Sequence, residues 1–209
     1  MFMIQDALSR TAIATSDSSS LDYTVFRAIN GLAGRGPALD AAMIAFARYS
    51  PVVYAIALAL LWLTWKQRNQ RAALLAGISA LVALGLGQIV GHAFPRDRPY
   101  LAHHVSLLIT HSPDTSFPSD HTTLAFAIAV AVWQFNRRAG IALLIFGMLV
   151  AVARVYVGAH YPGDVVGGAV LGAVTSLIVL RLFKAPVLRR ALDRVFELLG
   201  RMRLAAKVE

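Results

Sequence analysis

AALLAGISALVALGLGQIVGHAF, residues 72–94, contains no Asp, Glu, Lys or Arg. At about 1.5 Å of helical rise per residue, this stretch is longer than the ~30 Å hydrocarbon core of a bilayer, so it predicts a membrane-spanning helix. Four further apolar runs occupy residues 38–65, 120–135, 139–157 and 164–183. The chain is 57% hydrophobic and 15% charged, whereas a soluble domain is about one-quarter charged. The predicted fold is therefore all-α, a polytopic membrane helix bundle of five to six spans with interfacial helices.

Two further segments are amphipathic and predict helices at the membrane surface. Residues 23–32 carry Phe26 and Ile29 on one side, with polar residues that include Asn30 elsewhere, which is typical of an interfacial helix. Residues 186–207 combine apolar side chains with several arginines and predict a basic amphipathic C-terminal helix.

The first apolar run contains Ser50-Pro51, and proline kinks or breaks a helix. Residues 38–65 are therefore either one kinked span, which we favour, or a half-helix followed by a span. No polar linker divides residues 1–209, so we expect a single domain with a polar N-terminal segment at 1–20. Small residues at four-residue spacing predict close packing of the last span; they are Gly163, Gly167, Gly168 and Gly172.

The basic residues between the spans indicate the orientation of the chain. They gather at one end of the predicted bundle and comprise Lys66, Arg68, Arg71, Arg137, Arg138 and the arginines of the C-terminal helix. The positive-inside rule makes this end cytoplasmic. Residues 95–118 and 158–163 then face the periplasm or the cell exterior from a bacterial inner (cytoplasmic) membrane. Contact with anionic membrane lipid accounts for the net charge of +9, so no nucleic-acid partner is expected.

The chain has no cysteine, which excludes disulfides and thiolate metal sites. His103, His104 and His111 are candidate metal ligands, but no carboxylate stands at ligand spacing among them. We interpret them as loop residues and expect neither a metal nor another cofactor. The oligomeric state stays open, a homo-oligomer included.

Three polar clusters stand at the ends of predicted spans and on one predicted face. They are PRDRP at 95–99, SFPSDH at 116–121, and Arg154 followed by His160 and Asp164. Arginines supply forked donors that suit phosphate oxygens. Ser119 begins a predicted helix, whose first N–H groups can hold an anion together with the serine hydroxyl. His121 and His160 suit a two-step phosphoryl transfer, in which one histidine attacks phosphorus and the other protonates the leaving oxygen.

Asp164 follows His160 across the turn Tyr161-Pro162-Gly163. A carboxylate on one imidazole nitrogen fixes the tautomer and leaves the lone pair of the other nitrogen free. The alternative role of Asp164 is to cap the last span, and the two roles are compatible.

These motifs resemble those of the type 2 phosphatidic acid phosphatase (PAP2) superfamily. The matching residues are Arg98-Pro99 in the first motif, Pro118-Ser119-Asp120-His121 in the second with Asp120 in place of a glycine, and Arg154, His160 and Asp164 in the third. The stretches SFPSDHTT at 116–123 and ARVYVGAHYPGDVVGG at 153–168 are more similar still to the branch of the bacitracin-resistance undecaprenyl-diphosphate phosphatases.

Two positions depart from the family pattern. Gly91 stands where the family has a lysine, and Ala153 where it has a serine. Loss of the lysine removes a cation from the phosphate site, which Arg96 or His92 would have to supply. In an extended segment Arg96 and Arg98 point the same way, so we favour Arg96 as the substitute. The alternative makes Arg96 a solvated loop residue.

The resemblance implies a role for each matched residue. His160 is expected to be the nucleophile, Asp164 its orienting partner, and His121 the general acid that later activates water. The residues expected to bind the phosphate are Arg98, Arg154, Ser119, Asp120 and Arg96. The implied activity is hydrolysis of undecaprenyl diphosphate to undecaprenyl phosphate and phosphate through a phosphohistidine, which recycles the carrier lipid of cell-wall synthesis.

The motifs concern only the phosphoryl group, so the lipid stays open. Phosphatidylglycerophosphate, phosphatidate and a lipid A phosphate are alternative substrates. A non-hydrolytic binder, such as a flippase or a bacitracin sensor, needs no nucleophile, so His121, His160 and Asp164 disfavour it. The vanadate-dependent haloperoxidases share the motif set, but they resemble soluble proteins, and the apolar runs disfavour that reading.

Overall fold

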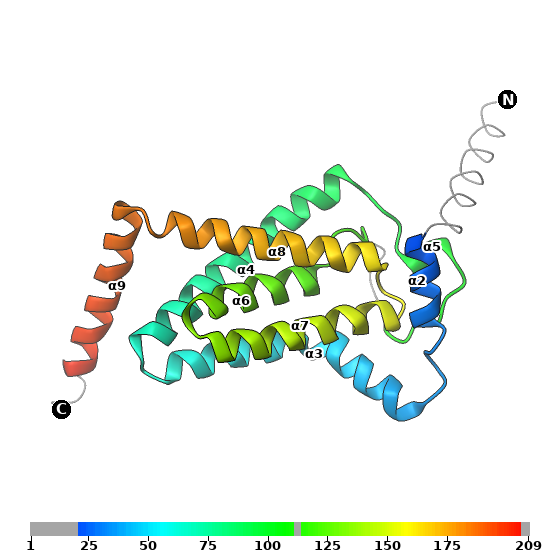
Figure 1. The fold of residues 1–209 in the computed structure, drawn as a ribbon, viewed down its shortest axis with the longest axis horizontal. Helices are drawn as coiled ribbons and strands as arrows, with labels where there is room; N and C mark the ends of the chain where they lie inside the picture. Colours follow the sequence, from blue (N-terminus) through cyan, green and yellow to red (C-terminus); the bar gives the residue numbers. More distant parts are fainter. Residues whose placement is uncertain (1–20, 111–113, 206–209) are drawn as a thin grey trace.

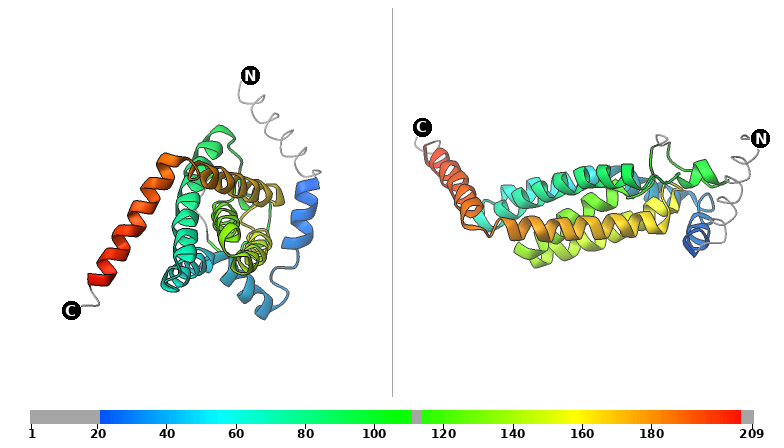
Figure 2. Two further views of the ribbon diagram at one scale, coloured as in Figure 1. Left: turned by 60° about the vertical axis from the view of Figure 1, so that its left-hand side comes forward. Right: turned by 90° about the horizontal axis from the view of Figure 1, so that it is seen from above.

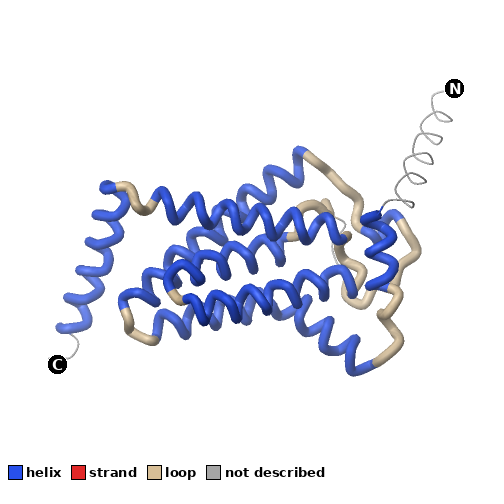
Figure 3. Tube along the Cα trace, in the orientation of Figure 1, coloured by secondary structure: helices blue, strands red, loops and turns tan. Residues whose placement is uncertain are grey.

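The computed structural model describes residues 21–110 and 114–205, and within them all regular secondary structure is helical (Figure 3). The helices are α2 (Leu21–Asn30), α3 (Pro37–Leu63), α4 (Gln67–Ala93), α5 (Pro99–Ala102), α6 (Asp120–Phe135), α7 (Arg137–Tyr156), α8 (Pro162–Leu182) and α9 (Pro186–Ala205). The predicted all-α class is confirmed. The polar segment 1–20, His111 and residues 206–207 of the predicted C-terminal helix lie outside the described residues.

Five helices, α3, α4, α6, α7 and α8, run along the long axis of the molecule (Figure 1). Helix α6 lies among the others and packs against α4, α7 and α8. Helix α8 approaches it through glycines, because a Cβ on Gly168 would lie 2.6 Å from the carbonyl oxygen of Ser119. A Cβ on Gly172 would overlap the carbonyl oxygen of Thr123. The predicted close packing of the last span is therefore confirmed at these two glycines.

Four helices within the described residues are long and apolar enough to cross a membrane, namely α3, α4, α7 and α8. Helix α6 has 16 residues. Its length of about 24 Å is short of the ~30 Å of a bilayer core. The side chains of α6 are mostly buried by its neighbours. All five predicted apolar runs thus form one bundle, in which α6 is the short inner member.

Helix α3 is continuous from Pro37 to Leu63 with Pro51 inside it. Figure 1 shows that its direction changes between the blue N-terminal part and the cyan C-terminal part. Proline removes one backbone hydrogen bond and crowds the preceding turn, which accounts for the bend. The interpretation of residues 38–65 as one kinked span is therefore confirmed.

The loops that precede α6 and α8 lie at the same end of the bundle as α2 and α5, whereas α9 extends from the opposite end (Figures 1 and 2). Hydrogen bonds connect the two loops directly. The Leu108 N–H donates to the Val157 carbonyl at 3.1 Å, and the Ser119 N–H donates to the Asp164 carbonyl at 3.1 Å. The prediction that residues 95–118 and 158–163 share one face is confirmed.

Helix α2 is more than the expected surface helix, because its last residue is buried. The Asn30 amide group donates to the carbonyl oxygens of Ser106 and Tyr156, both at 2.8 Å, and its Oδ1 accepts from the Ser106 N–H at 3.0 Å. The expectation that Asn30 lies away from the packed side was therefore wrong. Its amide satisfies backbone groups that would otherwise be buried without partners, and it fixes α2 to the end of α7.

Candidate active site

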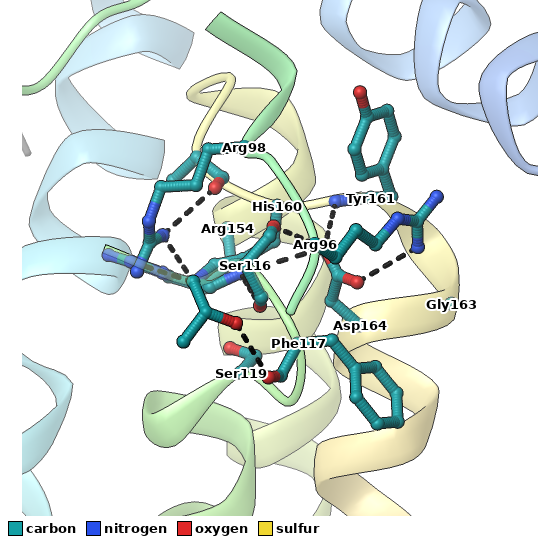
Figure 4. Close-up of polar contacts among 12 residues, drawn as sticks. Arg96, Arg98, Ser116, Phe117, Ser119, Arg154, His160, Tyr161, Gly163 and Asp164 are labelled. Atoms are coloured by element: carbon teal, nitrogen blue, oxygen red, sulfur yellow. Dashed lines mark hydrogen bonds and ion pairs between the residues drawn. The ribbon is translucent and has the colours of Figure 1, made fainter. Parts of the chain in front are cut away.

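His160 lies in the turn between α7 and α8 and is 2% exposed. Its Nδ1 is 2.8 Å from the carbonyl oxygen of Ser116. Its Nε2 is 3.1 Å from Nη1 of Arg98 and 3.1 Å from Nη2 of Arg154 (Figure 4). A carbonyl oxygen only accepts and a guanidinium only donates. Both sides of the ring therefore define the same tautomer, with the proton on Nδ1 and the lone pair on Nε2.

The charge state of His160 follows from its surroundings. Burial lowers the pKa of His160 to about 4, because the imidazolium would lose its hydration. The guanidinium groups of Arg154 and Arg98 lower this pKa further, and the Asp164 carboxylate offsets part of the shift. The ring is therefore neutral at pH 7, and Nε2 presents its lone pair between two cations. This is the state that a nitrogen nucleophile requires.

Asp164 acts on the imidazole through Ser116. Its Oδ2 is 3.8 Å from Nδ1 of His160, which is too far for a hydrogen bond. The same oxygen accepts from the Ser116 hydroxyl at 2.5 Å and from the Tyr161 N–H at 2.8 Å. Helix α8 begins at Pro162, so Asp164 caps it from the first turn and is not itself the N-cap residue. Asp164 and His160 thus lie within ion-pair distance, as expected, and Ser116 contacts both of them.

Arg98 is held in a fixed position by a backbone carbonyl and by the carboxylate of Asp114. Its Nη1 donates to the Ala159 carbonyl at 3.0 Å, and its Nε donates to Oδ1 of Asp114 at 2.8 Å. Arg98 and Arg154 are 4% and 1% exposed. Two guanidinium groups buried beside one lone pair form a site for an anion, because each offers parallel N–H donors to adjacent oxygens.

Ser119 is the N-cap residue of α6 and is fully buried. Its N–H donates to the Asp164 carbonyl at 3.1 Å, and its hydroxyl accepts from Oγ1 of Thr122 at 3.2 Å. The N–H of Ser119 is therefore used to join the starts of α6 and α8. The hydroxyl group is the part of Ser119 that can still turn to an anion.

The two residues after Ser119 have different surroundings. The Asp120 side chain lies against α4, where both carboxylate oxygens are 3.4 Å from Nε2 of Gln88. His121 is half-buried and lines a cavity of about 370 Å³ together with Arg154. The structure thus brings Arg98 and Arg154 to His160 directly, and His121 shares the cavity with Arg154. None of the hydrogen bonds described for Asp120 joins it to this group.

Arg96 does not point the same way as Arg98, so that expectation was wrong (Figure 4). Its Nη1 is 2.9 Å from Oδ1 of Asp164, and its Nη2 is 2.7 Å from Oδ2 of Asp22. The guanidinium also lies 4.0 Å from the centre of the Tyr161 ring. Burial alone would lower the pKa of Arg96, but the Asp164 and Asp22 carboxylates outweigh burial and raise it. The alternative of a solvated loop residue also fails, because the side chain is engaged by two carboxylates.

Position 91 leaves little room for a side chain. A Cβ on Gly91 would lie 3.0 Å from the Phe117 carbonyl oxygen and 3.2 Å from Cγ2 of Thr115. A side chain at this position would therefore require the loop that precedes α6 to shift by a few tenths of an ångström. The other proposed substitute, His92, is exposed, and its Nδ1 is 2.7 Å from the Gln88 carbonyl of its own helix. Ala153, in the position of the family's serine, is fully buried in an apolar cluster.

Ser116 and Asp22 are site residues to which the sequence analysis assigned no role. Ser116 contacts both His160 and Asp164, and only its place beside Pro118-Ser119 in the motif hinted at this. Asp22 accepts from the Gly163 N–H at 2.7 Å in addition to pairing with Arg96. No local pattern indicates a contact across 141 positions.

Of the loop histidines, His103 packs against aromatic rings. The His103 ring lies 4.0 Å from the Tyr23 ring and 6.2 Å from the Tyr161 ring, so it packs as an aromatic group between α2 and the start of α8. Within residues 21–110 and 114–205, no group of three or more His, Cys, Asp or Glu side chains is arranged to hold a metal ion.

A multi-pass helical membrane protein with a neutral histidine between two buried arginines has the features of a membrane lipid phosphatase. The chain belongs to the PAP2 superfamily, whose family model matches residues 72–187, from α4 to the beginning of α9. The resemblance inferred from the motifs is confirmed at the level of the family.

Individual relatives agree with this assignment. The chain is 38% identical to undecaprenyl-diphosphatase BcrC of Bacillus subtilis, over 77% of this chain and 83% of that protein. It is 35% identical to the bacitracin transport permease protein BcrC of Bacillus licheniformis, over 77% of this chain and 80% of that protein. The crystal structure of Aquifex aeolicus LpxE matches with a TM-score of 0.60 at 28% identity, over 78% of this chain and 96% of that chain.

Proposed function

We propose that the protein hydrolyses undecaprenyl diphosphate to undecaprenyl phosphate and inorganic phosphate, through a phosphohistidine formed on His160. The observation that carries the proposal is the position of Nε2 of His160, 3.1 Å from a guanidinium nitrogen of Arg98 and 3.1 Å from one of Arg154. An anionic phosphoryl group held by both arginines lies beside the lone pair that would attack it.

In the first step, Nε2 of His160 forms a bond to the terminal phosphorus, and the bond from that phosphorus to the bridging oxygen breaks. His121 gives a proton to the departing oxygen of the lipid phosphate. The positive charge that develops on the imidazole is stabilised by the Ser116 carbonyl at 2.8 Å and by the Asp164 carboxylate beyond it. Arg98 and Arg154 neutralise the phosphoryl oxygens.

In the second step, His121 accepts a proton from water, whose oxygen attacks the phosphorus of the phosphohistidine. The bond between phosphorus and Nε2 breaks, inorganic phosphate leaves, and His160 returns to its neutral form. The two steps need no metal, because arginines supply the positive charge that a metal ion would otherwise contribute.

The choice of lipid is supported by the relatives. The Bacillus subtilis relative is named an undecaprenyl-diphosphatase and aligns over 83% of its length. We further propose that the protein lies in the bacterial inner membrane with the site facing the periplasm or the exterior, because the basic helix α9 leaves from the end opposite the site (Figure 1).

The test of the reaction is phosphate release by the purified protein from undecaprenyl diphosphate, phosphatidylglycerophosphate, phosphatidate and a lipid A phosphate. We expect the highest kcat/KM on undecaprenyl diphosphate, and we expect His160→Ala to lose several orders of magnitude in kcat while remaining folded. A higher kcat/KM on another lipid would identify that lipid as the preferred substrate. Tight binding of the lipids without phosphate release would instead favour a non-hydrolytic binder.

Rapid quenching with a labelled diphosphate tests the intermediate. We expect an acid-labile, base-stable phosphoprotein that His160→Ala does not form. The orientation is tested separately with single cysteines, since the chain has none of its own. An impermeant maleimide should label His104→Cys in intact cells and label Arg68→Cys, at the other end of the bundle, only after permeabilisation. The opposite labelling pattern would invert the topology.

A further inference from the structure

A cavity of about 370 Å³ adjoins the candidate site and is lined by residues of α3, α6 and α7 and of the loop that precedes α6. Helix α3 contributes Ile44, Ala47 and Arg48, which lie three and four positions apart and so form one helical face. His121 on α6 and Arg154 on α7 line the same cavity. A cation from α3 therefore faces the space next to both of these residues.

Arg48 is an unusual residue for its position. It lies in the N-terminal half of α3, a helix long and apolar enough to span a membrane, and its side chain is exposed. The one contact described for its guanidinium is with the ring of the neighbouring Tyr49, at 6.0 Å. Among residues 21–110 and 114–205, no carboxylate lies within ion-pair distance of Arg48. An unneutralised charge in a membrane helix is costly and marks a site for a polar ligand.

The chemistry at His160 determines which part of a substrate would enter this cavity. Arg154 contacts Nε2 of His160 at 3.1 Å and also lines the cavity, so the cavity starts beside the phosphoryl group that is transferred. The leaving group lies on the side of His121, which protonates it. In a lipid diphosphate that leaving group begins with a second phosphate, whereas in a lipid monophosphate it is a neutral alcohol.

The second phosphate needs a cation that the positions considered so far do not supply. Gly91 has no side chain, and Arg96 is bound to Asp22 and Asp164. We propose that Arg48 binds the lipid-linked phosphate of the diphosphate and makes the site selective for diphosphates over monophosphates. The inference rests on the proposed function and assigns the residue that distinguishes its substrate class.

The experiment compares phosphate release from farnesyl diphosphate and farnesyl monophosphate, a pair that differs only in the second phosphate. In Arg48→Gln we expect kcat/KM on the diphosphate to fall about ten- to hundredfold, the effect of losing a charged hydrogen bond. We expect kcat/KM on the monophosphate to change less than about twofold, because this substrate has no second phosphate to contact Arg48. Arg48→Lys should recover part of the diphosphate activity. The matched control is Arg27→Gln on α2, an exposed arginine at the same end of the bundle.

Equal losses on both substrates, or no loss on either, would overturn the role of Arg48. A second measurement separates this inference from the proposed function. Calorimetric titration with methylenediphosphonate and with inorganic phosphate should show Arg48→Gln weakening only the diphosphonate. If the unaltered protein releases no phosphate from either farnesyl substrate, the proposed function fails, while the titration still decides whether Arg48 recognises a second phosphate.

Discussion

The hydroxyl group of Ser116 donates a hydrogen bond of 2.5 Å to Oδ2 of Asp164. The carbonyl oxygen of the same serine accepts from Nδ1 of His160 at 2.8 Å, while 3.8 Å separates that nitrogen from the carboxylate. One residue therefore holds the imidazole with its backbone and the carboxylate with its side chain. This arrangement keeps the lone pair of Nε2 aimed at Arg98 and Arg154.

Ser116→Ala removes the hydroxyl and keeps the carbonyl. We expect kcat to fall about ten- to hundredfold with KM nearly unchanged, because Asp164 loses a buried hydrogen bond that holds it near the imidazole. Steady-state phosphate release measures both constants, with Ser106→Ala, an exposed serine of the same loop, as the control. Adding Ser116→Ala to His160→Ala should have no further effect, since the two residues act as a unit. Additive losses in the double variant would show that Ser116 and His160 act independently.

The lowered pKa of His160 makes stability depend on pH in a defined window. The unfolded chain takes up this proton near pH 6.5, at about the ordinary pKa of histidine. The folded protein takes it up only near pH 4. Between these values the unfolded state binds more protons, so the free energy of unfolding falls as the pH falls from about 6.5 to 4. Above pH 6.5 the contribution is constant.

Thermal unfolding in detergent at pH 7 and pH 5 measures this effect. The fall in Tm on acidification should be smaller in His160→Asn, which has no titrating ring, than in the unaltered protein. His104→Asn, which removes an exposed histidine, is the control. Equal pH dependence in all three proteins would show that His160 titrates as an ordinary histidine.

Arg96→Ala should lower kcat by similar factors on farnesyl diphosphate and farnesyl monophosphate. Its guanidinium supports Asp164 at 2.9 Å and does not face Arg98, so its loss disturbs the support of His160 and spares neither substrate. Asp22→Asn removes the charge of the other carboxylate that Arg96 contacts. It should also lower kcat on both substrates, by a smaller factor. A loss of activity on farnesyl diphosphate only would instead support Arg96 as the substitute for the missing lysine.

Gly91→Lys should destabilise the protein instead of improving the site. Even the Cβ of a new side chain meets the Phe117 carbonyl at 3.0 Å, and overpacking of this kind costs roughly 1–3 kcal/mol. The matched pair is Gly91→Ala and Gly85→Ala, because a Cβ on Gly85 of the same helix meets nothing within 4 Å. We expect Gly91→Ala to lower the Tm and Gly85→Ala to leave it unchanged. Equal Tm values would mean that the loop before α6 yields readily.

Hydrophobic runs predicted the helices well, since the cost of exposing a polar backbone to lipid leaves few alternatives to a helix. The predicted boundaries of α6, residues 120 and 135, agree with the structure at both ends. The site was harder, because its contacts join distant segments. Asp22 and Ser116 have no local pattern that indicates their partners. The alternation argument for Arg96 failed because two carboxylates, one of them on α2, attract its side chain away from Arg98.

Asp22 stands near the beginning of the described chain, and its partners follow 74 and 141 positions later. During synthesis α2 therefore leaves the ribosome long before the groups that it binds. Neither the N-terminus of α8 nor the carboxylate of Asp164 exists until synthesis has reached the start of α8. A partly synthesised chain consequently lacks His160 and Asp164 together, and the site becomes complete only when the start of α8 meets α2.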